Sequence, residues 1–217
     1  MFVPKRFDLI IFDWDGTLVN TIDWIVHCLQ DAAVRCRFEV PEDQAAKDVI
    51  GLSIDNAVRQ LFPEADKDSR NTFIEHYGKA FFAKQLSRAD LFKGVFDMLN
   101  VLRASGYRLA VATGKGRKGL QKALMQTGTE HLFDITRCAD ETASKPAPVM
   151  LQEIIDRLEI PAERALMVGD SIHDLQMARN AGIVSAAVAC GAHSPELLRQ
   201  YDPLFNLAQT SQLLEFI

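Results

Sequence analysis

Two carboxylates spaced one residue apart, Asp13 and Asp15, are the side chains in this sequence best suited to chemistry. They come directly after the apolar run of residues 10–12, and Gly16, a residue typical of turns, follows them. Two like charges at the end of a buried strand are unfavourable unless a cation lies between them. The motif therefore indicates a site for a divalent metal ion or for chemistry on a phosphate group.

Three further polar clusters follow apolar, strand-like runs later in the chain. They are Thr113, Gly114 and Lys115 after residues 109–112, Lys145 after the next strand, and Asp170 and Asp174 after residues 166–168. Taken singly, each cluster also has a structural interpretation as a turn, a solvated lysine or a helix cap. Ligands of open α/β sheets bind outside the carboxyl ends of the strands, so we expect all four clusters to converge on one crevice.

These residue types together suit phosphoryl transfer. A carboxylate can attack phosphorus and form an aspartyl-phosphate that water later hydrolyses. A second carboxylate two residues along can serve first as an acid and then as a base. A hydroxyl and a lysine can hold the phosphoryl oxygens while charge redistributes, and Mg²⁺, which prefers hard oxygen ligands, offsets the repulsion between carboxylate and phosphate.

Strands that alternate with helices must position these groups. We predict strands at residues 7–12, 107–112, 133–137, 165–168 and 184–189, and helices at 95–105, 118–126, 148–158 and 172–181. This alternation is typical of a parallel sheet with helices on both faces. The expected fold class is α/β, with a Rossmann-like core.

One stretch interrupts the alternation with helices alone. They are predicted at residues 22–38, 42–49, 54–62 and 66–86. We therefore expect two domains: a catalytic core made of residues 1–20 and 87–217, and a small four-helix cap made of residues 21–86. The two connections between them would permit the cap to move as a hinged lid.

Composition limits the partners of the chain. Its 217 residues carry a net charge of −5, with a pI of about 5.5, which argues against nucleic acid or an anionic membrane surface as a partner. No apolar stretch approaches the roughly 20 residues that span a bilayer, and residues 1–5 lead into the first strand without a signal-peptide pattern. We expect a cytoplasmic protein whose four cysteines are reduced structural thiols.

The set and order of these motifs resemble the haloacid dehalogenase superfamily, in particular its phosphoglycolate phosphatase-like branch with a helical cap after the first strand. The resemblance rests on DWDGTLVNT at 13–21, the Thr113 cluster, Lys145 in KPAP, and GDSIHD at 169–174. It implies a Mg²⁺-dependent phosphatase that hydrolyses a small phosphorylated metabolite through an aspartyl-phosphate. A monomer or weak dimer is expected, because the cap must move.

The resemblance also implies a role for each motif residue. Asp13 would be the nucleophile and Asp15 the general acid and base, while Thr113 and Lys145 would bind the transferring phosphate. Mg²⁺ would be held by the Asp13 carboxylate, the Asp15 backbone carbonyl and Asp170, with Asp174 in a supporting position. Gly114 and Lys115 would line the same loop, and Gly51, in the cap loop at residues 50–53, would approach the substrate unless this loop is a plain interhelical turn.

Alternative functions remain open at this stage. Asp15 argues against dehalogenase and phosphonate-cleaving chemistry, whose members lack an aspartate at this position. A phosphomutase of the β-phosphoglucomutase type would carry a histidine one turn into the first cap helix, and His27 lies two places late. A phospho-accepting signalling module would be shorter and would lack both the cap and Asp15. No residue identifies the substrate among glycolate, sugar, polyol and nucleotide phosphates.

Overall fold

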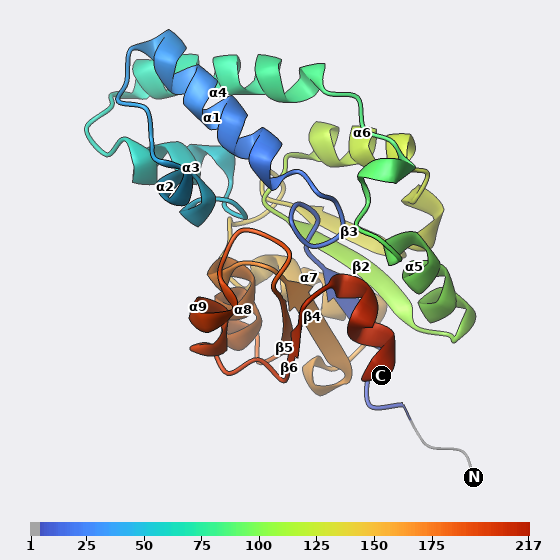
Figure 1. The fold of residues 1–217 in the computed structure, drawn as a ribbon. Helices are drawn as coiled ribbons and strands as arrows, with labels where there is room; N and C mark the ends of the chain where they lie inside the picture. The colour runs from blue at the N-terminus through green and yellow to red at the C-terminus, as the bar shows by residue number, and fades with distance from the viewer. Residues whose placement is uncertain (1–4) are drawn as a thin grey trace.

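A six-stranded parallel sheet forms the centre of the molecule, with the strand order β3-β2-β1-β4-β5-β6 (Figure 1). The computed structural model describes residues 5–217, so the expectation for the extreme N-terminus lies largely outside the described residues. The strands are β1 (Leu9–Phe12), β2 (Arg108–Thr113), β3 (Ile135–Cys138), β4 (Ala165–Gly169), β5 (Val184–Val188) and β6 (Phe205–Leu207). The predicted α/β class is confirmed. Strand β6 was not predicted, because its three residues are too few to show a period.

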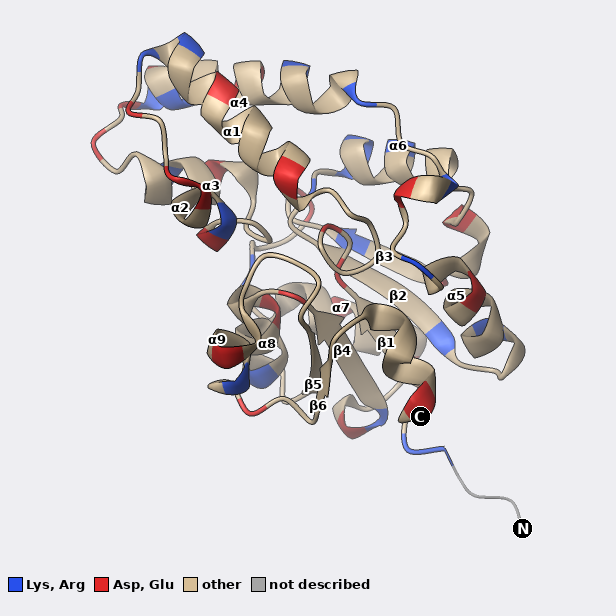
Figure 2. Cartoon of the chain, viewed as in Figure 1, with Lys and Arg blue, Asp and Glu red and all other residues tan. Residues whose placement is uncertain are grey.

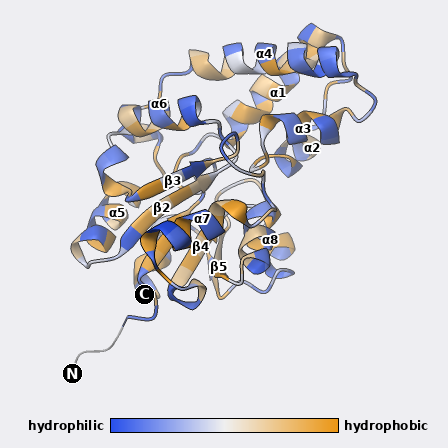
Figure 3. Ribbon diagram, turned by 180° about the vertical axis from the view of Figure 1, so that it is seen from behind, coloured by the Kyte–Doolittle hydropathy of each residue, from blue (hydrophilic) through white to orange (hydrophobic). Residues whose placement is uncertain are grey.

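Helices cover both faces of this sheet, because successive strand residues point to opposite sides. Ile10 and Phe12 of β1 belong to the hydrophobic cluster on one side, and Leu9 and Ile11 belong to the cluster on the other. The first side carries α5 (Val95–Ala104) and α6 (Arg117–Thr127), and the second carries α7 (Val149–Leu158) and α8 (Ile172–Asn180). Figure 3 shows the hydrophobic strands between helices of mixed hydropathy.

Several short helices lie between or after these elements. They are α9 (Pro195–Arg199) and the 3-10 helices η1 (Arg88–Asp90), η2 (Glu130–Leu132), η3 (Ala162–Arg164) and η4 (Thr210–Glu215). None of them was predicted, because each is too short for a helical pattern to repeat. The last of them places Leu213 in the same hydrophobic cluster as α5.

Four helices with a core of their own follow β1 in the chain. They are α1 (Ile22–Cys36), α2 (Asp43–Asp48), α3 (Ile54–Leu61) and α4 (Lys67–Ala83). Phe73 of α4 is fully buried at their centre, where its ring lies 6.0 Å from that of Phe38 and 5.2 Å from that of Phe62. Figure 1 shows these helices grouped together, away from the two chain termini. We propose, on this separate core, that residues 21–86 form the cap domain.

Polar contacts join the four helices to the rest of the chain. The Ser53 backbone N–H donates to Ser144 Oγ at 2.8 Å, and the His173 ring nitrogen Nε2 lies 2.8 Å from the backbone oxygen of Asp48. His173, in the first turn of α8, thus contacts the end of α2. These contacts hold the loop that follows α2 against the carboxyl ends of the strands.

The distribution of charged residues and the state of the cysteines agree with what the sequence predicts. Figure 2 shows acidic and basic residues interspersed along the helices. All four cysteines are free thiols, as predicted. Among residues 5–217, the structure contains no helix of the length and hydrophobicity that crossing a bilayer requires.

Candidate active site

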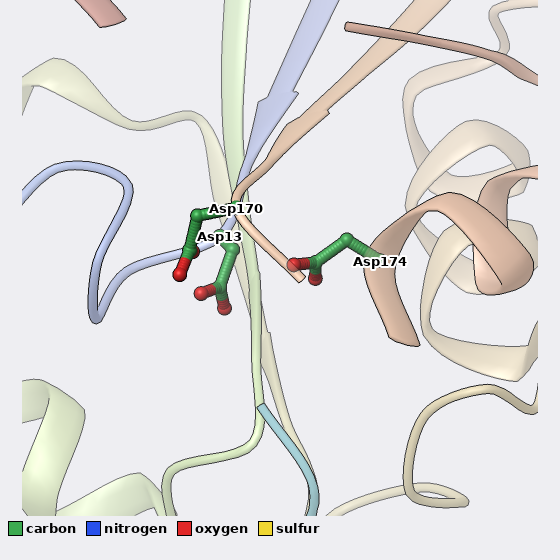
Figure 4. A group of neighbouring side chains, drawn as sticks. All are labelled: Asp13, Asp170 and Asp174. Atoms are coloured by element: carbon green, nitrogen blue, oxygen red, sulfur yellow. The ribbon is translucent and has the colours of Figure 1, made fainter. Parts of the chain in front are cut away.

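Three buried carboxylates meet where β1 and β4 end. Asp13 and Asp170 directly follow these strands, and Asp174 lies in the first turn of α8 (Figure 4). Each contributes a carboxylate oxygen to a group whose members all lie within 4.8 Å of one another, and each side chain is almost fully buried. The Asp13 backbone N–H donates to the Val168 carbonyl at 2.9 Å. This hydrogen bond extends the β1–β4 pairing and fixes the position of Asp13 relative to the end of β4.

Hydrogen bonds orient the two later carboxylates. Asp170 accepts from the Thr17 hydroxyl and from the Ala192 backbone N–H, both at 2.7 Å. Asp174 accepts from the Ser171 hydroxyl at 2.6 Å, in a capping box that begins α8. A Cβ on Gly191 would lie 2.0 Å from Asp170 Oδ2, so only glycine leaves room for this carboxylate. The cluster is therefore held in position by its surroundings.

Lys145 is the cation of this cluster. Its ammonium nitrogen lies 2.6 Å from both Asp13 Oδ1 and Asp174 Oδ1, and its side chain is fully buried. Burial acts to lower the pKa of Lys145, but the two carboxylates outweigh it and raise that pKa, so the side chain stays charged. One ammonium offsets only one of three carboxylates, and the ionised cluster therefore keeps a net negative charge.

The excess negative charge of the cluster, together with burial, raises the pKa values of two of its carboxylates. Burial raises the pKa of Asp13, and the Asp174 charge raises it further, against the opposing effect of Lys145. Burial, followed by the Asp13 and Asp174 charges, raises the pKa of Asp170. A bound dication would reverse both effects, and all the donors are oxygens, the ligand type that Mg²⁺ prefers. These residues therefore fit a divalent cation.

Asp15 is not a member of this carboxylate group, and other residues hold its side chain. Its Oδ2 lies 2.7 Å from the Lys115 ammonium, and its Oδ1 accepts from the Thr21 hydroxyl at 2.5 Å. Gly16 has a φ of +80°, and a Cβ there would lie 2.3 Å from Asp170 Oδ2, so the turn that follows Asp15 requires glycine. The metal contact expected of Asp15 concerns its backbone carbonyl and stays a prediction.

The end of β2 meets the loop between α2 and α3. Thr113 is buried, and its Oγ1 accepts from the Lys115 backbone N–H at 3.2 Å. A Cβ on Gly114 would lie 2.4 Å from the backbone oxygens of both Gly51 and Leu52, so glycine permits this close approach. Gly51 itself has a φ of +98°. The loop at residues 50–53 is therefore more than a connection between helices, because its backbone packs against Gly114 in the loop that follows β2.

One cavity of about 310 Å³ connects these groups. Six of the predicted site residues line it: Asp13, Asp15, Gly51, Thr113, Gly114 and Lys115. Lys145, Asp170 and Asp174 lie buried beside Asp13 and outside the cavity wall. The four strand-end clusters thus converge on one place, as predicted. The chemical role of each residue stays a prediction.

Another residue considered in the sequence does not reach this cavity. The His27 side chain is exposed and its ring lies 5.4 Å from that of Trp24. The sequence analysis missed Tyr77 and Phe81 of α4, which line the cavity. Their spacing of four residues was a helical signal, but it did not say which surface that helix face would contact.

The family model for haloacid dehalogenase-like hydrolases matches residues 10–188 of the chain. The "Probable phosphatase IndB" of Dickeya dadantii (strain 3937) is 35% identical over 199 residues, which cover 90% of this chain and 86% of the relative. The "Pyrophosphatase PpaX" of Halalkalibacterium halodurans is 28% identical, over 96% of this chain and 95% of that protein.

Comparison with a solved structure shows that a related protein has the same fold. The "predicted phosphoglycolate phosphatase" of Haemophilus somnus 129pt superimposes with a TM-score of 0.82 at 25% identity, over 97% of this chain and 98% of that one. The predicted recognition and enzyme class are confirmed by these comparisons. The chain belongs to the haloacid dehalogenase-like hydrolase family, among relatives named as phosphatases.

Proposed function

We propose that this enzyme is a Mg²⁺-dependent phosphomonoester hydrolase that works through an aspartyl-phosphate on Asp13. One observation carries the proposal: the Asp13 carboxylate belongs to a buried acidic cluster that fits a cation, and it also faces the cavity that Asp15 and Thr113 line. A nucleophile, an acid–base group and a phosphate-binding hydroxyl are thus available to one small ester.

In the first step, a carboxylate oxygen of Asp13 attacks phosphorus. Lys145 contacts Oδ1, which leaves Oδ2 available to form the new bond. The bond between phosphorus and the ester oxygen breaks, and Asp15 donates a proton to the departing oxygen. Thr113 and Lys145 hold the phosphoryl oxygens during the transfer. Bound Mg²⁺ would supply the positive charge that lets the carboxylate approach the phosphate.

In the second step, water attacks the phosphorus of the aspartyl-phosphate. Asp15, now ionised, accepts a proton from this water, and Asp13 leaves as a free carboxylate. Lys115 and Thr21 keep Asp15 in one orientation through contacts at 2.7 and 2.5 Å. Asp15 is thereby restored to its acid form, and the cycle closes with the release of inorganic phosphate.

Hydrolysis is favoured over the phosphomutase alternative because, among residues 5–217, the histidine that a mutase needs has no counterpart in the cavity wall. His27, the nearest candidate in the sequence, is exposed, and its ring lies next to that of Trp24 at a tilt of 34°. A signalling module is disfavoured because the cavity is enclosed by cap residues that such a module would lack.

Phosphate release from a panel of esters tests the proposal. The panel contains phenyl phosphate, 2-phosphoglycolate, glycerol 3-phosphate, glucose 6-phosphate and a mononucleotide, each with Mg²⁺ and with EDTA. We expect release from at least one ester with Mg²⁺, loss of that release in EDTA, and recovery when excess Mg²⁺ is added. Undiminished release in EDTA would contradict the metal requirement, and the absence of release from every ester would contradict the hydrolase.

A further inference from the structure

The cavity above Asp13 is lined mostly by hydrocarbon. The apolar and aromatic side chains in its wall are Ile25, Leu29, Val49, Ile50, Leu52, Ile54, Ala57, Ile74, Tyr77, Phe81 and Phe82. They come from the cap helices and the loop at residues 50–53, so they surround the part of a substrate that projects from the phosphate. Its volume of about 310 Å³ is at the lower end of the range for small-molecule pockets.

The wall offers no free cation to a second anionic group. Its charged residues within the described part of the chain are Asp13, Asp15 and Lys115. The Lys115 ammonium lies 2.7 Å from Asp15 Oδ2 and 4.2 Å from the centre of the Phe81 ring, and its side chain is 7% exposed. Lys115 is held against Asp15 and the Phe81 ring, so a substrate carboxylate or second phosphate could reach it only by displacing these contacts. Otherwise that group would be buried without a partner, which is strongly unfavourable.

Two aromatic rings of α4 form a regular face in this wall. The Tyr77 and Phe81 rings stack with their centroids 5.5 Å apart and their planes at 18°. Burial, and then the nearby Asp15 carboxylate, raises the pKa of Tyr77 well above its usual value, so the phenol stays protonated. An aromatic or aliphatic group can pack on this face without losing hydrogen bonds.

Gly78 opens the space next to these rings. It lies inside α4, where glycine is less favourable than alanine, and it lines the cavity. A Cβ built on Gly78 would have no atom of the described residues within 4 Å, so no packing contact in this part of the chain requires glycine here. The missing side chain instead adds room to the cavity beside Tyr77.

We propose that the enzyme selects phosphate monoesters whose leaving group is a single apolar group, aromatic by preference, and that it discriminates against esters with a second anionic group. The inference rests on the proposed hydrolase function, because it concerns the selectivity of that same site. Pyrophosphate and phosphoglycolate, which appear in the names of related proteins, both carry such a second charge. The apolar wall of this cavity and the contacts that hold Lys115 leave such a charge without a partner.

A pair of matched esters tests the charge discrimination. Phenyl phosphate and 4-carboxyphenyl phosphate differ by one carboxylate, and the carboxylated phenol is the better leaving group. We expect kcat/KM for phenyl phosphate to exceed that for 4-carboxyphenyl phosphate, 2-phosphoglycolate and pyrophosphate by on the order of 100-fold. A kcat/KM for any of these three substrates that equals or exceeds the value for phenyl phosphate would overturn the selectivity. If phosphate release still depended on Mg²⁺, the hydrolase function itself would stand. No release from any ester would instead overturn the hydrolase.

The Gly78→Leu variant tests the position of the leaving group. A leucine there fills the cavity beside Tyr77, so we expect the kcat/KM ratio of 2-naphthyl phosphate to phenyl phosphate to fall on the order of 100-fold. Lys79→Leu is the matched control, because it adds the same side chain at the next position of α4, on an exposed face outside the cavity. That control should keep the wild-type ratio.

A milder substitution keeps this test interpretable if leucine disturbs the fold. Gly78→Ala is favourable within a helix, and we expect it to lower the same ratio by a smaller factor. Thermal unfolding monitors the integrity of both variants. A ratio that stays at the wild-type value in folded Gly78→Leu and Gly78→Ala proteins would show that the leaving group lies elsewhere, which would refute the proposal.

Discussion

The Asp13→Asn variant should lose turnover almost completely, with kcat reduced on the order of 10⁴- to 10⁶-fold. An amide has nearly the same shape as the carboxylate, but it is a poor nucleophile and carries no charge. The variant therefore removes the group that forms the bond to phosphorus while it leaves the packing around β1 unchanged. Steady-state phosphate release with Mg²⁺ and the preferred ester measures the effect.

The same variant should fold at least as stably as the wild-type protein in metal-free buffer. Asp13 is one of three buried carboxylates that repel each other, and Lys145 keeps its contact with Asp174 when Asp13 is replaced. Asp156→Asn, at an exposed position of α7, is the matched control and should keep full activity. Normal Mg²⁺-dependent turnover by Asp13→Asn would contradict the assignment of the nucleophile.

Lys145→Met should damage both stability and catalysis. The ammonium of Lys145 is fully buried and lies 2.6 Å from two carboxylates, so its removal leaves the buried acidic cluster without a compensating charge. Breaking a buried ion pair from one side typically costs about 3–5 kcal/mol of folding free energy. We expect a loss of this size in urea unfolding without metal, and a fall in kcat of about 10²- to 10³-fold from the lost stabilisation of the phosphoryl oxygens.

Mg²⁺ separates the two roles of this lysine. A dication bound among the carboxylates replaces part of the missing positive charge, so it should restore part of the lost stability of Lys145→Met but little of its activity. Lys118→Met, on an exposed position of α6, provides the control for the substitution itself. If Lys145→Met unfolded at the same urea concentration as the wild-type protein without metal, the three carboxylates would not be ionised together and the electrostatic account of the site would be wrong.

Local sequence patterns were enough to predict the strand ends and the groups that follow them. Asp13, Thr113 and Asp170 each come directly after an apolar run, and parallel strands bring their carboxyl ends to one edge whatever the details of packing. The prediction therefore needed the order of elements and not their exact contacts. The same reasoning gave the four cap helices, whose observed bounds differ from the predicted ones by a few residues.

Contacts between distant parts of the chain lay beyond such patterns. Lys145 reaches Asp13 across 132 positions of sequence, and the Ser53 backbone N–H donates to Ser144 across 91 positions. The helical spacing of Tyr77 and Phe81 marks an apolar face but not the cavity that it meets. Gly78 illustrates the same limit, because a helical glycine signals a role only when the space beside it is known.

Trapping the phosphorylated enzyme tests the central claim most directly. Asp15→Asn lacks the base that activates water, so after brief mixing with Mg²⁺ and the preferred ester, followed by acid quench, it should carry about one phosphoryl group per chain. Borohydride reduces an acyl phosphate to the alcohol, and peptide mass spectrometry should find homoserine at position 13. A phosphoryl group on another residue, or turnover by the wild-type enzyme with no label trapped on Asp15→Asn, would contradict the aspartyl-phosphate mechanism.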